Sequence, residues 1–194
     1  MPVNCSTRRG VLLSASLAAT GLFNLRDAIA AMDGSDGDWL AMVKAHHKLV
    51  AKTFEQMLDS GSRTFLKRDA MQHALSYQLT AHSVAEENVL YPALARMGLL
   101  TESDRLYLDQ GHAKVQNAEL ALVSEKDESA WFDKVRTLQA AVLKHALQDE
   151  EADIYPRLLQ KTDKATNVML ATAYKRHFES VKPVRSTMDM GKPG

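Results

Sequence analysis

The chain has 194 residues, enough for one domain with a substantial hydrophobic core. It carries 24 basic and 24 acidic side chains, and this balance lacks the positive field of nucleic-acid-binding domains, so we expect no nucleic-acid partner. The single cysteine, Cys5, excludes an intramolecular disulfide and a cluster of thiolate ligands. Seven histidines are a surplus that points to metal or proton chemistry.

Residues 1–30 resemble a twin-arginine export signal. Arg8 and Arg9 precede an apolar run over residues 11–25, and an Ala-Ile-Ala sequence at 28–30 supplies the small residues that a signal peptidase requires. The run of about 15 residues is shorter than the roughly 20 that span a bilayer. We therefore expect cleavage of this segment, a periplasmic or otherwise exported protein, and no membrane association of the mature chain.

Apolar side chains recur at steps of three and four along most of the remaining chain, after a polar leader at residues 31–37. This spacing places them on one face of a helix. Alternation typical of strands is almost absent. The predicted helices span residues 38–58, 65–95, 103–124 and 127–160, followed by a weaker helix over residues 166–181.

Four long amphipathic helices with short connections predict an all-α fold, an up-down-up-down antiparallel four-helix bundle over residues 38–162. The short extra C-terminal helix and a tail would occupy residues 163–194. Pro92 is expected to kink or distort the end of the second helix, because proline interrupts helical hydrogen bonding. Thr101 and Ser103 are expected to cap the third helix.

The second and fourth helices contain similar stretches that both end in Tyr-Pro, at residues 82–92 and 145–156. Counted back from the Tyr-Pro, Glu86 matches Glu150. Each stretch also follows another histidine on the preceding helix. These upstream histidines are His47 and His112. The repetition suggests a helix pair used twice, with a site built between the two copies.

Each of the four predicted bundle helices places a histidine on its apolar stripe. These residues are His47, His82, His112 and His145. A polar group buried there without a partner would cost about 2–7 kcal/mol. His82 and Glu86 are four residues apart, so they are neighbours on one helix face. The stripes therefore point to a polar site inside the bundle.

Two positions leave alternatives open. Glu150 follows His145 by five residues, which rotates it by about 140° on an ideal helix, whereas Asp149 is the better four-step neighbour. The register set by the Tyr-Pro repeat favours Glu150. His46 could replace His47, although the apolar stripe of the first helix favours His47.

Imidazole nitrogen and carboxylate oxygen together suit iron, zinc, copper or manganese. Four histidines and two carboxylates are too many ligands for one tetrahedral zinc. They suit two metal ions that share bridging acids. A redox-active pair with open coordination positions would attract dioxygen or a related small ligand.

The ordered set of histidines and acids resembles the hemerythrin-like (HHE cation-binding) family. That family carries one histidine, then His-x-x-x-Glu, then one histidine, then a histidine with a following Glu or Asp. The matching residues are His47, His82 with Glu86, His112, and His145 with Glu150, within residues 38–160. The resemblance implies a four-helix bundle around two non-heme irons bridged by carboxylates.

One departure from the family pattern concerns the third helix. Oxygen-carrying members have a second histidine four residues after the third-helix histidine, and here that position is Gln116. One iron should then lose a nitrogen ligand and keep more open positions. The ferritin-like di-iron bundle needs Glu-x-x-His motifs, and the sequence contains none.

These features predict a metal-binding protein that binds or senses dioxygen, nitric oxide or peroxide. The alternative is a di-iron enzyme that turns over peroxide or nitric oxide, or that oxidises iron. No separate acid, base or nucleophile group stands out, so turnover would have to be the metal's own chemistry. A third interpretation is a partner-binding bundle whose histidines are incidental.

Overall fold

The computed structural model describes residues 37–59 and 64–182, and every regular element within them is helical. This confirms the predicted all-α class. The expected export signal lies outside the described residues. The first bundle helix is α2 (Trp39–Leu58), and the second consists of α3 (Phe65–Ala85), a π-helical segment η1 (Glu86–Leu90) and α4 (Tyr91–Arg96).

The third bundle helix is α5 (Leu100–Ala121), and the fourth consists of α6 (Glu128–Leu143), a second π-helical segment η2 (Lys144–Ile154) and α7 (Tyr155–Gln160). The predicted C-terminal helix is present as α8 (Lys164–Ser180). No helix in the described ranges is both long and apolar enough to cross a membrane.

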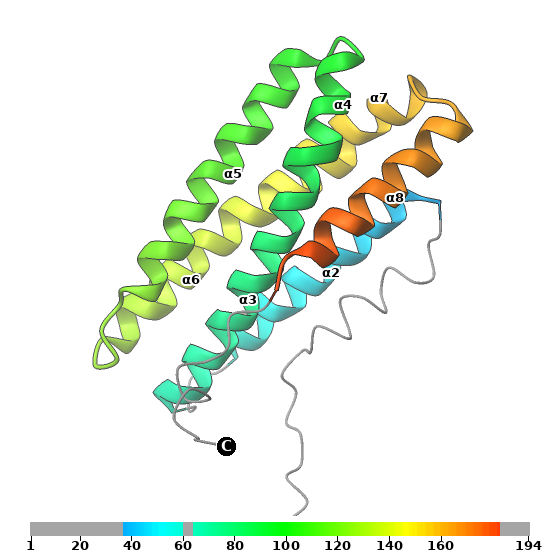
Figure 1. The fold of residues 1–194 in the computed structure, drawn as a ribbon. Coiled ribbons are helices and arrows are strands. Elements are labelled where there is room, and N and C mark those ends of the chain that lie inside the picture. Colours follow the sequence, from blue (N-terminus) through cyan, green and yellow to red (C-terminus); the bar gives the residue numbers. More distant parts are fainter. Residues whose placement is uncertain (1–36, 60–63, 183–194) are drawn as a thin grey trace, which may run out of the picture.

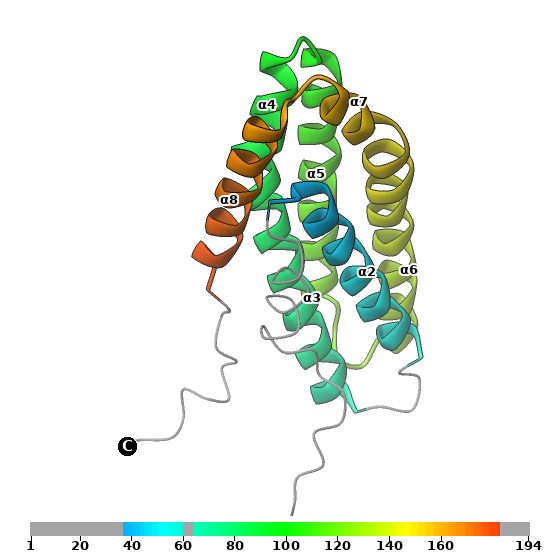
Figure 2. The same cartoon turned by 90° about the vertical axis from the view of Figure 1, so that its right-hand side faces the viewer.

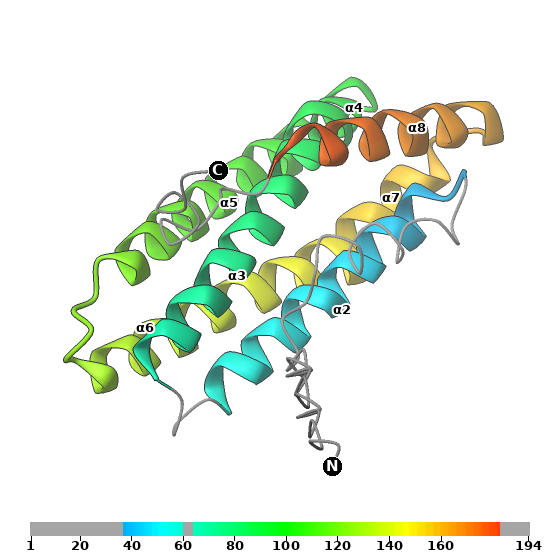
Figure 3. The ribbon, with the colours of Figure 1, turned by 60° about the horizontal axis from the view of Figure 1, so that its bottom comes forward.

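The four long helices run antiparallel and close into a bundle (Figures 1 and 2). Helix α2 packs against α3 and α6, while α5 packs against α4 and α6. Helix α8 lies outside this bundle (Figure 3), where it contacts α3 and α2. The indole nitrogen of Trp39 donates a 2.9 Å hydrogen bond to the side-chain oxygen of Asn167, which ties α8 to the start of α2.

Two apolar clusters divide the core along the length of the bundle. One includes Val43 and Ala85, and the other includes Val50 and Leu75. On α2, His47 lies between Val43 of the first cluster and Val50 of the second. The buried histidines and acids therefore form a polar layer with apolar side chains on both sides of it.

The two repeated stretches share a local feature that helical periodicity did not reveal. Each contains a π-helical segment directly before its Tyr-Pro, and the amides of Tyr91 and Tyr155 donate to the carbonyls of Glu86 and Glu150, five residues back. A proline ring clashes with the carbonyl four residues before it. The distortion expected at Pro92 therefore takes the form of a widened turn, a feature often found at functional sites.

Helix α5 turns a different face inward from the one that was predicted. Helical spacing predicts an inner stripe that includes Leu108, Val115 and Leu122 together with His112. This stripe is wrong, because Leu108, Val115 and Leu122 are 64%, 58% and 84% exposed. The buried residues of α5 are Ser103, Leu106, Gln110 and Leu120. The inner face of this helix mixes polar and apolar side chains, while other apolar residues of the helix are exposed, so apolar spacing does not mark the side that faces the bundle.

The start of α5 also differs from the prediction. The helix begins at Leu100, and neither Thr101 nor Ser103 caps it. Instead the Ser103 hydroxyl donates a 2.9 Å hydrogen bond to the carbonyl of Tyr91. This bond joins α5 to the segment of the second helix that carries the Tyr-Pro.

Candidate metal centre

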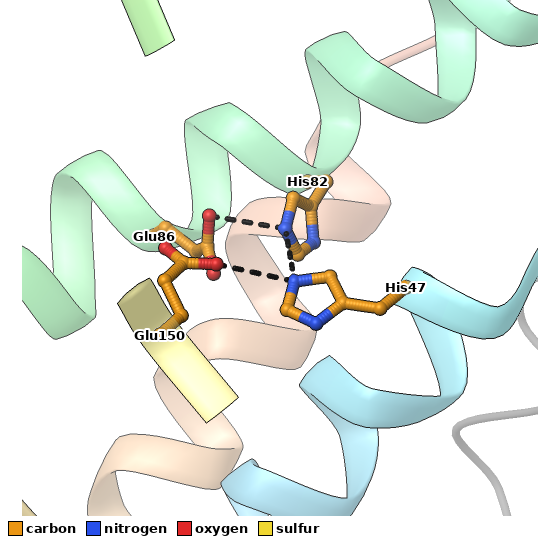
Figure 4. A group of neighbouring side chains, drawn as sticks. All are labelled: His47, His82, Glu86 and Glu150. Atoms are coloured by element: carbon orange, nitrogen blue, oxygen red, sulfur yellow. Dashed lines mark hydrogen bonds and ion pairs between the residues drawn. The ribbon is translucent and has the colours of Figure 1, made fainter. Parts of the chain in front are cut away.

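Four predicted ligand residues meet inside the bundle: His47 from α2, His82 from α3, Glu86 from η1 and Glu150 from η2. One potential ligand atom from each lies within 4.8 Å of the others, and all four side chains are buried (Figure 4). Both carboxylates have no solvent exposure. Buried carboxylates are costly unless they are paired or hold a cation.

The spacing of these atoms fits a metal ion. His47 Nε2 lies 3.1 Å from His82 Nε2 and 3.2 Å from Glu150 Oε2, and His82 Nε2 lies 3.1 Å from Glu86 Oε2. Ligands about 2.1 Å from a metal lie roughly 3 Å apart when they are at right angles. When both imidazoles are neutral and unprotonated at Nε2, a shared cation satisfies the two facing nitrogens better than they satisfy each other.

His145 lies on the other side of Glu150, outside this group of four. Its Nε2 is 3.2 Å from Glu150 Oε1, whereas His47 faces Oε2 of the same carboxylate. The Tyr91 hydroxyl lies 3.2 Å from His145 Nε2 and donates to Glu150 Oε1 at 2.9 Å. The two oxygens of Glu150 therefore face different histidines.

Glu86 is held by groups that the sequence did not indicate as part of the site. The Tyr155 hydroxyl lies 2.5 Å from Glu86 Oε1 and 2.8 Å from Glu150 Oε1. The Gln110 amide donates to Glu86 Oε2 at 2.6 Å. The carboxylates of Glu86 and Glu150 thus face the imidazoles of His47 and His82 on one side. On the other side they face His145, two tyrosine hydroxyls and the Gln110 amide.

The structure does not bring His112 to this site. It lies on the exposed face of α5, and Gln110 takes the inward position instead. The prediction that His112 lies on the inner face is wrong, for the same reason as the α5 stripe. Asp149 is separately paired with Lys144 at 2.8 Å and with Arg105 at 3.3 Å, so Glu150 is the acid that joins the cluster.

The five-residue step from His145 to Glu150 is explained by the local helix type. Both residues lie in η2, where hydrogen bonds join residues five apart. A five-residue step in such a segment completes about one turn, so the acid returns to the face of the histidine. The ideal α-helix assumed in the prediction hid this relationship.

Each of the two histidines that face each other also has a polar contact at its other ring nitrogen, Nδ1. Glu151 Oε1, from the residue that follows Glu150, lies 2.7 Å from His47 Nδ1. The Tyr174 hydroxyl lies 3.0 Å from His82 Nδ1 and 3.1 Å from His46 Nδ1. His46 is therefore buried behind the cluster, and His47 is the histidine that enters it.

The charges of the cluster shift its proton affinities when no metal ion is bound. Burial opposes the charged imidazole of His47, but hydrogen bonds to Glu150 and Glu151 outweigh this and raise its pKa to about 9. Burial also opposes the charged form of His145, and the charge of Glu150 raises its pKa to about 9. Burial works against ionised Glu150, but His145 and His47 hold its pKa well below the usual value.

A cavity of about 180 Å³ reaches the cluster between α2, α3, α5 and α6. His47, His82 and His145 line its inner end, and most of the other lining groups are aliphatic. Asp109, Lys114 and other polar residues also line it. This space gives a small molecule access to the three imidazoles.

Replacing His112 with alanine should leave metal content and stability unchanged, because the side chain is exposed and is not part of the cluster. An exposed substitution of this kind changes the free energy of unfolding by about 0.5 kcal/mol or less. Elemental analysis and thermal unfolding would measure both quantities, with His82→Ala as the comparison that loses metal. A loss of metal in His112→Ala would show that α5 presents another face to the site.

A buried group of imidazoles and carboxylates inside a four-helix bundle defines a metal-binding protein of the helical-bundle class. The family model described as the hemerythrin HHE cation-binding domain matches residues 39–158, more than half of the chain. The chain therefore belongs to this family. No curated protein and no solved structure matches it.

Proposed function

We propose that this protein holds two non-heme iron ions and uses them to bind or sense dioxygen, nitric oxide or peroxide. One observation carries the proposal: Glu150 presents one oxygen to His47 and the other to His145, each at 3.2 Å. A carboxylate placed in this way can be shared by two ions. Such a buried anion between two imidazoles suits a pair of cations better than a single one.

His47, His82, Glu86 and Glu150 would hold the first ion. His145, Glu150 and the Tyr91 hydroxyl would hold the second, since these three groups lie 2.9–3.2 Å from one another. The second ion would thus have one imidazole where the first has two. Iron, when bound, supplies a redox-active Lewis acid with open coordination positions.

The cavity supports a small ligand. Its volume of about 180 Å³ exceeds the roughly 30 Å³ that one water occupies in the liquid. Three imidazoles line the cavity, and seven of its other thirteen lining residues are aliphatic, which favours a small uncharged molecule. Dioxygen and nitric oxide fit this description, and peroxide can reach the same groups.

The test is metal analysis of protein purified anaerobically after iron-replete expression and without a metal-affinity tag. We expect two irons per chain and an absorption spectrum that changes when oxygen or azide is added. His145→Ala should keep one iron, because the first ion retains all its ligands. One zinc and no iron in the parent protein would contradict the proposal, and steady-state consumption of peroxide would favour an enzyme.

We also propose that the protein is exported. Arg8 and Arg9 before an apolar run, and Ala30 at the end of an Ala-Ile-Ala sequence, support a twin-arginine signal. Mass spectrometry of the protein from the periplasm should find a chain that begins at Ala31. An intact chain in the cytoplasm would contradict this proposal.

A further inference from the structure

Helix α8 lies beyond the family match, which ends at residue 158, yet one of its side chains reaches the metal centre. The hydroxyl of Tyr174 lies 3.0 Å from His82 Nδ1 and 3.1 Å from His46 Nδ1. Tyr174 has no solvent exposure, and both histidines are buried. The contact is therefore shielded from competing water.

When a metal is bound at His82, one arrangement of hydrogens satisfies both contacts and also uses the Tyr174 hydroxyl hydrogen. His82 Nε2 faces the cluster, so its lone pair must be free for the metal and its proton must sit on Nδ1. His82 Nδ1 then donates to the Tyr174 oxygen. The single hydroxyl hydrogen of Tyr174 is left to donate to His46 Nδ1, so His46 carries its own proton on Nε2.

We propose that Tyr174 is a positioning residue of the metal centre, which fixes the orientation and tautomer of His82 through a hydrogen bond and is itself fixed by His46. The inference rests on the proposed function, because it assumes that His82 ligates a metal. Groups that accept the second N–H of a ligating histidine set its ring orientation and basicity. Helix α8 thereby becomes part of the metal centre as well as part of the core.

The fold holds this contact in place from two sides. At one end of α8, Asn167 accepts the hydrogen bond from Trp39. At the other, the ring of Phe178 packs 3.9 Å from the ring of His46, measured between centroids. His47, the neighbouring ligand, has the carboxylate of Glu151 in the equivalent place. The two ligand histidines thus have acceptors of different charge, and the neutral one comes from α8.

The test compares Tyr174→Phe with a matched control, Tyr77→Phe, in the full chain. The Tyr77 ring is partly buried against the core, but its hydroxyl has no hydrogen-bond partner among the described residues. Tyr174→Phe should weaken Co²⁺ binding by about 10- to 100-fold, the usual effect of removing such a partner. The control should bind Co²⁺ as the parent protein does.

A second measurement uses the parent protein, so its main result does not depend on how well the variant folds. Long-range ¹H–¹⁵N correlation spectra of the Zn²⁺-loaded protein should show His82 protonated on Nδ1 and His46 on Nε2, with slow exchange of the His82 proton. In Tyr174→Phe that proton should exchange faster.

The opposite tautomer at either histidine, or Co²⁺ affinity within twofold of the parent in a folded Tyr174→Phe protein, would overturn the inference and leave the proposed function intact. A parent protein that binds no metal would overturn both.

Discussion

Replacing Glu150 with glutamine is expected to abolish metal binding and to destabilise the metal-free protein. Glu150 contacts His47 through one oxygen and His145 through the other, so both proposed ions lose a charged ligand. Glutamine keeps the volume of the side chain but removes its negative charge. Without it, the two buried imidazoles also lose their anionic partner, and breaking a buried ion pair costs about 3–5 kcal/mol.

Elemental analysis of iron and denaturant unfolding of the metal-free protein would measure these effects. The control is Glu87→Gln, which alters the acid beside Glu86. Glu87 pairs with Lys114 at the edge of the bundle, so this variant should keep its iron and most of its stability. If Glu150→Gln retained two irons, Glu150 could not be the carboxylate that they share.

The metal-free protein should lose stability as pH rises from about 6.5 to about 9. His47 and His145 have folded-state pKa values of about 9, above the ordinary value of 6.5. Their stabilising contribution is therefore complete below the unfolded pKa and is lost as pH rises through the folded pKa. A shift of this size corresponds to on the order of 3 kcal/mol for one histidine, and the two are not additive because they share Glu150.

At acid pH, the stability of the metal-free protein should change in the opposite direction and fall as pH falls. The pKa of Glu150 lies well below its usual value in the folded protein. Its contribution is present above the unfolded pKa, near 4.5, and is lost as pH falls through the folded value. Stability of the metal-free protein should thus be greatest between about pH 4.5 and 6.5.

Bound metal should reverse the alkaline trend, because His47 and His145 must release their protons before they can ligate. Thermal unfolding from pH 5 to 9.5, with and without Co²⁺, would measure both curves. The stabilisation by Co²⁺ should grow with pH up to about 9. A metal-free protein that gains stability over the same range would contradict the charge arrangement described for the cluster, and His112→Ala provides a matched control with one histidine fewer at the surface.

Residue spacing alone predicted the helices, the fold class and most of the candidate metal centre. Apolar spacing marks a helix wherever one face packs against a core, because burial follows the period of the backbone. The repeated His and Glu before each Tyr-Pro identified His82, Glu86, His145 and Glu150 as neighbours in the site. These relationships are local, or repeat along the chain, and so can be recognised without knowing how the helices pack.

The packing of the helices sets which side of α5 faces the centre. The exposed Leu108 and Val115 mimic an inner stripe, while Gln110 is buried because it bonds to a carboxylate on another helix. The contact of Tyr174 with His82 joins residues 92 positions apart. Such contacts depend on the rotation of each helix and on the docking of α8, and neither is encoded in the spacing of residues along a single helix.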